Sequence, residues 1–593
     1  MRLKTKYEIG TLPHAEHPTP QSERDTWRSL NGAWSFYRER TDGSRADEGT
    51  ILVPFSPETL NSGLPEGFVL GAGERLIYRR TVTLDATLLR GCTLLHFGAV
   101  DSECEVFWNG TWVGSHRGGF TAFTLDITAQ ARVGENEITV ICTDEATRNG
   151  GARGKQSDRR GGIWYTPQSG IWQSVWLESM PRTHIRELRI VPDATTKTVT
   201  LSSDSFGEAQ TVRVLDGTRE ILRGEYTESI LLSYDFELWS PEHPKLYGLE
   251  ITNASGDCLR SYFGVRSFGM AKDVQGRMRL TLNGKPYFFN GVLDQGYWSD
   301  GMLTYPSDEA AIAELQMLKD MGFNTVRKHI KLEPMRWYYH CDRLGLAVWQ
   351  DFPNGGGDYR FTHVAAFPFL GFHHKDSDYR YFAREDTRAR DEFRGMVDEI
   401  LCQLGNVVSI ALWVPFNEGW GQFDSAFYTS YVRKKDPTRL IDSVSGWHDQ
   451  GVGKTDMRSL HTYYTPLKVP RDERPVVLSE FGGYSQKCTG HVFDEQLEFG
   501  YKKFKTADAL ATALQKLYQS KLLPLIAQGL CGCIYTQVSD VEEEINGLVT
   551  YDRAVIKVPI EVMRALNDQI ARAADEVRMP ERNDLHSNKE KGI

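Results

Sequence analysis

The feature that most constrains the fold is a change of sequence pattern near residue 272. From there on, apolar runs of strand length alternate with longer runs of helical periodicity, beginning with PYFFNGV (286–292) and SDEAAIAELQMLKDMGF (307–323). Ser307 is placed to cap that first helix. Eight apolar strand candidates follow one another, mostly with helical connections. The pattern predicts a (β/α)₈ barrel over residues 272–593.

The residues before this point have the pattern of β-sandwiches. Short runs of Val, Ile, Thr and aromatic residues recur with turn residues between them and no long helical segment. The Asn109-Gly110 step between two such runs predicts a two-residue hairpin. With a boundary near Pro181, we predict one sandwich over residues 1–180 and a smaller one over residues 181–271.

Composition excludes several classes of protein. The 593 residues carry a formal net charge of −10, which argues against a nucleic acid partner because phosphate binding needs clustered cations. No apolar run reaches the ~18 residues of a membrane span, and the N-terminus lacks the apolar stretch of a signal peptide. Nine cysteines, an odd number, indicate reduced thiols. We therefore expect a cytoplasmic protein without a membrane partner, and leave homo-oligomer formation open.

Barrel enzymes place their chemistry at the carboxyl ends of the strands. Polar residues follow all eight strand candidates: Asp294 and Gln295, Lys328 and His329, Asp351, Asn417 and Glu418, Asp442, His461 with Tyr463 and Tyr464, Glu480, and Gln537 with Asp540. Glu418 and Glu480 follow the fourth and seventh candidates, which lie across a barrel mouth from one another. Glycoside hydrolysis needs such a pair, because one carboxylic acid protonates the leaving oxygen while the other carboxylate attacks the anomeric carbon or activates water.

Four motifs together resemble glycoside hydrolase family 2, which contains β-galactosidases, β-glucuronidases and β-mannosidases. They are WVPFNE (413–418), SEFG (479–482), GIWQSVW (170–176) and FGVR (263–266). The resemblance implies a jelly-roll sugar-binding-like domain, an immunoglobulin-like sandwich and a catalytic TIM barrel, in the order and sizes derived above.

The resemblance also implies roles for individual residues. Glu418 corresponds to the general acid/base and Glu480 to the nucleophile of a retaining double-displacement mechanism. Asn417 would bind the sugar 2-hydroxyl, and Tyr463, in preference to Tyr464, would donate a hydrogen bond to the nucleophile. We list as further substrate-binding candidates the residues Asp351, His329, His461, Trp447, Tyr535 and Asp294.

Several of these candidates have an ordinary structural alternative. Asp351 can cap the loop that follows it, the two histidines can be hydrogen-bonded residues at the core rim, and Trp447 can pack a loop. No metal-ligand spacing is assigned and no cofactor is expected to be required, although a structural or activating cation is left open. GGARGKQ (150–156) lacks the spacing of a phosphate-binding loop.

The sugar specificity is predicted from differences between this sequence and the family motifs, and from the charge of residues 542–553. GVLDQG (291–296) and Tyr535 differ from the residues usual in galactosidases and glucuronidases, while WQDF (349–352) is closer to the mannosidases. EEEINGLVTYDR (542–553) lacks the Asn-x-Lys motif of the glucuronidases, and its acidic residues would repel a uronate.

We therefore predict an exo-acting retaining β-galactosidase that binds a carbohydrate substrate. The alternatives are β-mannosidase, β-glucuronidase or arabinosidase activity. A further alternative is a carbohydrate-binding protein without turnover, against which the two converging carboxylates argue.

Overall fold

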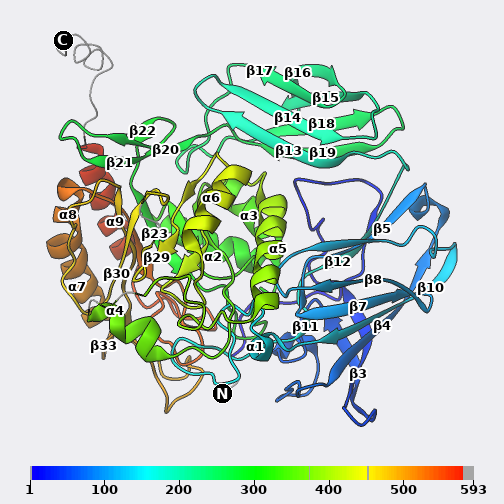
Figure 1. Ribbon diagram of the computed structural model, residues 1–593, viewed down its shortest axis with the longest axis horizontal. Coiled ribbons are helices and arrows are strands. Elements are labelled where there is room, and N and C mark those ends of the chain that lie inside the picture. Colours follow the sequence, from blue (N-terminus) through cyan, green and yellow to red (C-terminus); the bar gives the residue numbers. More distant parts are fainter. Residues whose placement is uncertain (1–2, 371, 373, 451–452, 578–593) are drawn as a thin grey trace.

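The computed structural model describes residues 3–370, 372, 374–450 and 453–577. Two all-β regions lie against one side and the top of a barrel in the view of Figure 1. The fold is thus multidomain, with N-terminal β-sandwich sheets followed by a parallel barrel.

The first sandwich is built from two antiparallel sheets. The larger sheet has the order β3 (Arg45–Val53), β2 (Gly32–Glu39), β4 (Arg75–Leu84), β10 (Gly134–Thr143), β7 (Glu103–Trp108), β8 (Thr111–Arg117). The smaller sheet has the order β1 (Trp27–Ser29), β12 (Val175–Met180), β5 (Cys92–Phe97), β9 (Phe123–Asp126). Buried aromatic and aliphatic side chains from both sheets, Trp34 and Leu177 among them, form one core. The predicted hairpin is confirmed: Asn109 and Gly110 have φ of 51° and 76° and join β7 to β8.

The second sandwich pairs a sheet of three strands with one of four. Their orders are β13 (Arg186–Asp193), β14 (Thr198–Asp204), β17 (Ser229–Ser233) and β16 (Arg219–Tyr226), β15 (Gln210–Asp216), β18 (Tyr247–Asn253), β19 (Cys258–Phe263). Alternating residues such as Val199, Val212 and Leu249 form its core. A small sheet of β20 (Phe268–Lys272), β21 (Met278–Leu282) and β22 (Lys285–Pro286) leads into the barrel.

The eight predicted barrel strands are present and parallel. In chain order they are β23 (Phe289–Asp294), β24 (Thr325–Lys328), β25 (Ala347–Asp351), β26 (Ile410–Val414), β28 (Leu440–Ile441), β30 (Arg458–Thr462), β31 (Val476–Gly482) and β34 (Leu530–Thr536). They form one sheet in which β34 pairs with β23, as closure of a barrel requires.

Helices cover the outside of the barrel. The larger ones are α2 (Asp308–Asp320), α3 (Met335–Leu344), α5 (Thr387–Leu404), α6 (Ser425–Lys435), α7 (Ala507–Leu517) and α9 (Ile560–Asp575). A π-helical turn at Tyr518–Leu522 separates α7 from α8 (Leu523–Gln528). In the described part of residues 442–475, β28, β30 and β31 are joined by loops rather than helices. No helix within the described ranges is long and apolar enough to cross a membrane.

Side chains of the barrel strands alternate between two apolar layers. Phe289, Leu293 and Trp349 belong to the core inside the barrel, whereas Val292 and Val326 belong to the layer between the sheet and the helices. The same alternation continues into the polar strand ends. It therefore decides which polar residues face the barrel mouth.

Candidate active site

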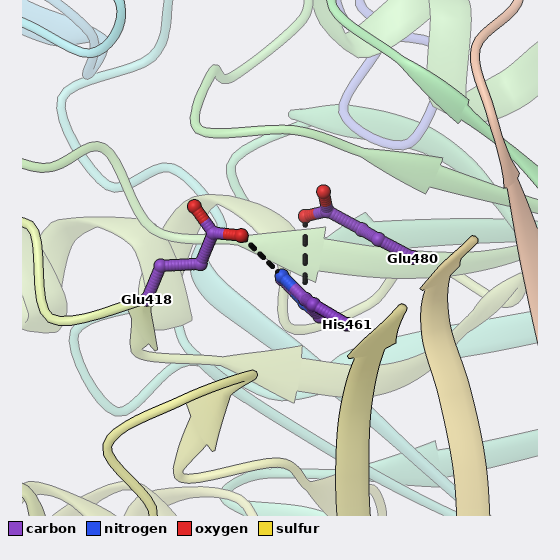
Figure 2. Close-up of side chains that lie close together, drawn as sticks. All are labelled: Glu418, His461 and Glu480. Carbon is purple, nitrogen blue, oxygen red and sulfur yellow. Dashed lines mark hydrogen bonds and ion pairs between the residues drawn. The ribbon is translucent and has the colours of Figure 1, made fainter. Parts of the chain in front are cut away.

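Two glutamates converge at the barrel mouth. Glu480 belongs to β31, and Glu418 directly follows the short strand β27 (Phe416–Asn417). One carboxylate oxygen of each, together with a ring nitrogen of His461, lie within 4.8 Å of one another (Figure 2). Glu418 has φ of 53°, in the left-handed region that residues other than glycine rarely adopt and that is common at functional sites. The two carboxylates are close enough to act on one bond.

His461 lies between the two glutamates. Its Nδ1 is 2.5 Å from Glu418 Oε1, and its Nε2 is 3.5 Å from Glu480 Oε1 (Figure 2). Ser445 Oγ is 2.8 Å from the same Nε2. The sequence indicated His461 only as a possible sugar contact. The structure makes it a direct partner of both carboxylates.

Arg327 is a central residue of this site that the sequence analysis did not name as a candidate. Its Nη1 donates to Glu480 Oε1 at 3.0 Å, and its Nη2 donates to Asn417 Oδ1 at 2.9 Å. Its Nε and Nη2 also bind both oxygens of Asp351 at 3.0 and 2.9 Å. Burial acts to lower the pKa of Arg327, but the carboxylates of Asp351 and Glu480 hold it above its usual value, so the guanidinium stays charged.

The signal for Arg327 was present in the strand alternation. Val326 packs in the outer layer, so Arg327 faces inward and Lys328 faces outward. A charged side chain inside a barrel is unfavourable unless it is paired, and here three strand ends supply partners.

Glu480 and Asn417 differ in their hydrogen bonding. The hydroxyl of Tyr463 donates to Glu480 Oε2, which gives Glu480 a second strong donor beside Arg327. Two such donors stabilise a carboxylate anion. The buried Nδ2 of Asn417 has no hydrogen-bond partner within the described part of the chain, so it is a donor available to a sugar hydroxyl.

His329 and Asp351 form a second polar pair beside Arg327. His329 Nδ1 is 2.7 Å from Asp351 Oδ2. Burial and the charge of Lys155 hold the pKa of His329 well below its usual value, so this histidine is neutral. Burial raises the pKa of Asp351, while Arg327 acts in the opposite direction. Trp447 lies beside His461, and the centres of the two rings are 6.3 Å apart.

Two candidates, Asp294 and Tyr535, lie on the other face of the sheet. Asp294 Oδ2 is 2.5 Å from Lys328 Nζ, which also contacts Glu333 at 2.8 Å. Tyr535 belongs to the apolar layer under the helices and packs edge-on against Phe481. The structure brings the other predicted site residues together and leaves these two outside that group.

The electrostatics of Glu418 differ from what its expected role suggests. Burial raises its pKa, but the charge and hydrogen bond of His461, the charge of Lys155 and the Trp420 indole outweigh this effect, and the pKa is lowered. Trp420 Nε1 donates to Glu418 Oε2 at 3.0 Å. The contacts of Glu418 with His461 and Trp420 therefore favour its ionised form, whereas a general acid carries a proton.

Comparison with models of protein families shows the family to which the chain belongs. Two family models match it: "Glycosyl hydrolases family 2, sugar binding domain" over residues 63–181 and "Glycosyl hydrolases family 2, TIM barrel domain" over residues 273–555. The chain belongs to glycoside hydrolase family 2.

Individual relatives are distant. A β-galactosidase of Enterobacter cloacae is 26% identical over 392 residues, which is 61% of this chain and 35% of that protein. A β-galactosidase of Thermoanaerobacter pseudethanolicus is 25% identical over 378 residues, or 57% of this chain and 46% of that protein. The matched part thus spans between a third and a half of these relatives.

Solved structures share the fold over nearly the whole chain. A β-D-glucuronidase of Dictyoglomus thermophilum has a TM-score of 0.71 at 18% identity and covers 93% of this chain and 98% of its own. A family 2 β-galacturonidase of Eisenbergiella tayi bound to galacturonate has a TM-score of 0.69 at 17% identity and covers 95% and 99%. At these identities the likeness concerns the fold.

Proposed function

We propose that this family 2 chain is a retaining exo-β-glycosidase that releases terminal non-reducing β-D-galactosyl residues. The observation that carries the proposal is the close approach of Glu418 and Glu480, with oxygens within 4.8 Å. Retaining enzymes hold their two carboxyl groups ~5–5.5 Å apart, whereas inverting enzymes leave ~6.5–9.5 Å for a water molecule.

In the first step, Glu480 attacks the anomeric carbon and forms a glycosyl ester. The bond to the aglycone breaks, and its oxygen takes a proton from Glu418. In the second step, Glu418 takes a proton from water, the resulting hydroxide attacks the anomeric carbon, and Glu480 leaves as a carboxylate. Arg327 and Tyr463 donate to the two oxygens of Glu480 and orient this carboxylate for attack.

Glu418 needs a proton at the moment of glycosidic cleavage. A lowered pKa would leave it mostly ionised at neutral pH if it acted alone. Its 2.5 Å contact with His461, whose charge and hydrogen bond lower this pKa against the effect of burial, therefore helps to set the pH above which the acid loses its proton.

Galactose is the sugar that the sequence favours, on the ground that residues 542–544 would repel a uronate. In the structure, residues of the first sandwich form an ion pair or a hydrogen bond with two of these glutamates. Such contacts reduce the repulsion that the glutamates would exert on a uronate. Arg160 lies 2.6 Å from Glu543, and Tyr165 donates to Glu544 at 2.5 Å. A β-uronide is accordingly the second candidate, favoured by the buried lysine Lys155, whose charge acts on Glu418. Proteins of similar fold include a named β-glucuronidase and a named β-galacturonidase.

A panel of aryl β-glycosides tests the activity and the sugar together. We expect hydrolysis of the β-galactoside, with the β-anomer as the first product in an NMR time course. A 2-deoxy-2-fluoro-galactoside with a good leaving group should inactivate the protein and label Glu480, as peptide mass spectrometry would show.

Three results would count against the proposal. An α-anomer as the first product would indicate inversion. A label on Asp351 or Asp540 would identify a different nucleophile. No hydrolysis across the panel, combined with measurable sugar binding, would favour the carbohydrate-binding alternative.

A further inference from the structure

A loop of the first sandwich enters the barrel mouth. It runs from the helical turn α1 (Ala146–Asn149) toward β11 (Gly170–Ile171) and contains the segment 150–157. The backbone amides of Arg153 and Gly154 donate to the carbonyl of Asn354 at 2.8 and 3.0 Å. The guanidinium of Arg153 binds the Gly357 carbonyl at 3.2 Å. The loop is thus fixed to the segment that follows β25.

Gly154 allows this close approach. Its φ is 61°, and a Cβ atom at this position would lie 2.9 Å from the carbonyl oxygen of Ile330, just beyond β24. The next residue, Lys155, therefore lies near the ends of β24 and β25. His329 directly follows β24, and Asp351 is the last residue of β25. The sequence of residues 150–156 lacks the spacing of a phosphate-binding loop, and nothing in it indicates that Lys155 belongs to the barrel site.

Two tryptophan side chains connect Lys155 to Glu418, the proposed acid. Its side chain is 6% exposed, and its Nζ is 5.7 Å from the centre of the Trp164 ring. Trp164 meets Trp420 edge-on at 5.2 Å, and Trp420 donates to Glu418. A short chain of contacts therefore connects the lysine of one domain to the glutamate of another.

Lys155 differs from the other buried lysines in its partners. Among the described residues, Lys328, Lys331 and Lys557 are buried and each contacts at least one carboxylate within 2.8 Å. For Lys155, the described part of the chain provides no hydrogen bond or ion pair to Nζ. The contact that Nζ does make, with the Trp164 ring, neutralises no charge, so this cation is available to an anionic group.

The charge of Lys155 acts on the site itself. Burial raises the pKa of Glu544, and Lys155 is the largest of the influences that lower it. The same ammonium contributes to the lowered pKa of Glu418. At Asp351, where burial raises the pKa, Lys155 acts in the lowering direction together with Arg327 and His461. Lys155 therefore lies among the groups that would surround a bound sugar.

We propose that Lys155 is a substrate-binding residue that the first sandwich contributes to the barrel site, where its ammonium group binds the carboxylate of an acidic β-glycoside. This inference rests on the proposed glycosidase function and extends its substrates from the β-galactoside to the β-galacturonide, which has the same ring configuration and carries a carboxylate at C6. It also gives the first sandwich a part in specificity, because removal of that domain would remove the cation.

Two matched substrates test this proposal. An aryl β-D-galactoside and the corresponding aryl β-D-galacturonide differ only in the oxidation state of C6. We expect the native protein to hydrolyse the galacturonide, and Lys155→Gln to lower its kcat/KM relative to that of the galactoside by about 30-fold or more, as expected when one member of a buried charge pair is removed. Lys155→Arg should retain part of the preference because it keeps the charge.

Arg159→Gln is the matched control. It removes a positive charge from the same loop, but Arg159 is exposed, so the ratio of the two kcat/KM values should be unchanged. Thermal melting of each variant checks that the loop and its domain remain folded.

The possible outcomes separate this inference from the function on which it rests. An unchanged ratio in a folded Lys155→Gln variant would overturn it, as would a native protein that cleaves only the galactoside. If the native protein hydrolyses no glycoside, the glycosidase proposal fails. Titration with galacturonate by calorimetry then decides the role of Lys155: binding that Lys155→Gln abolishes supports the role, and equal binding by both proteins overturns it.

Discussion

Two clusters of buried charge lie at the carboxyl ends of the same barrel strands, one on each face of the sheet. The outer cluster lies under the helices and consists of Asp294, Lys328, Lys331 and Glu333. The inner cluster lies at the barrel mouth and consists of Arg327, Asp351, Glu418, Glu480 and His461. They are built from the same types of residue, yet their balance of charge differs.

The outer cluster is balanced. Its two ammonium groups face two carboxylates, and Lys331 Nζ also donates to the carbonyls of Gly296 and Leu303 at 2.7 Å. In the inner cluster, one guanidinium and one histidine face three carboxyls. Lys155, whose charge acts on Glu418 and Asp351, forms no ion pair with them within the described part of the chain. An excess of negative potential is suited to an oxocarbenium-like transition state, which gains positive charge at the anomeric carbon. We infer that the balanced cluster stabilises the fold and the unbalanced one serves catalysis.

The largest effect should follow removal of Glu480. Glu480→Ala eliminates the proposed nucleophile, and we expect kcat for an aryl glycoside to fall by about 10⁴-fold or more. The melting temperature should change little, because the lost carboxylate belonged to an excess of negative charge. Steady-state kinetics with melting curves check both points. A variant that retains most of its activity would contradict the assignment of the inner cluster.

Breaking the outer cluster should have the opposite pattern. Lys328→Ala leaves Asp294 and Glu333 without their shared cation, and breaking a buried ion pair costs about 3–5 kcal/mol of stability. We expect a clearly lower denaturant midpoint, while kcat per folded molecule is retained. Lys516→Ala, at an exposed position in α7, is the control and should shift the midpoint little. A large loss of kcat in folded Lys328→Ala would show that the outer cluster also serves catalysis.

This comparison explains which parts of the site were predictable. The strand pattern predicted the barrel, and Glu418 and Glu480 were identified because carboxylates directly after apolar strands are chemically conspicuous. The face of the barrel sheet on which each polar strand-end residue lies was predicted less well. Asp294 shares the outer face of Val292, two residues earlier, and Arg327 lies opposite the outer Val326. Applying the two-residue alternation to each strand end would have excluded Asp294 and included Arg327.

Other features depend on contacts between distant segments. One of them is the π-helical turn between α7 and α8, which the periodicity of the sequence does not indicate. Lys155 reaches the barrel only because two domains pack together, and local pattern carries no information about that packing. His461 was identified as a candidate, but its position between both glutamates follows from the register of β30 beside β31.

A smaller effect should separate two adjacent tyrosines. Tyr463→Phe removes the hydroxyl that donates to Glu480, and we expect kcat to fall by about 10²-fold, the loss typical of removing one such donor. Tyr464 is 75% exposed, so Tyr464→Phe should leave kcat nearly unchanged. Measuring both variants with one substrate decides between the two assignments that the sequence left open. Equal losses in the two variants would contradict the role of Tyr463.

The smallest expected effect is a shift along the pH axis caused by His461. Burial raises the pKa of Glu418, but the charge and hydrogen bond of His461 are the largest influences that lower it. In His461→Asn both influences are reduced, so the pKa of Glu418 should rise.

A glycosidase loses activity as pH rises through the pKa of its acid. The alkaline limb of the kcat/KM profile should therefore move to higher pH in His461→Asn, by about one unit, which corresponds to ~1.4 kcal/mol of lost interaction. Glu418→Gln provides the reference, because it should lack this limb with substrates whose leaving groups need no protonation. If the limb stays in place or moves to lower pH in His461→Asn, then His461 does not set the proton affinity of Glu418, and the charge of Lys155 becomes the stronger candidate for that effect.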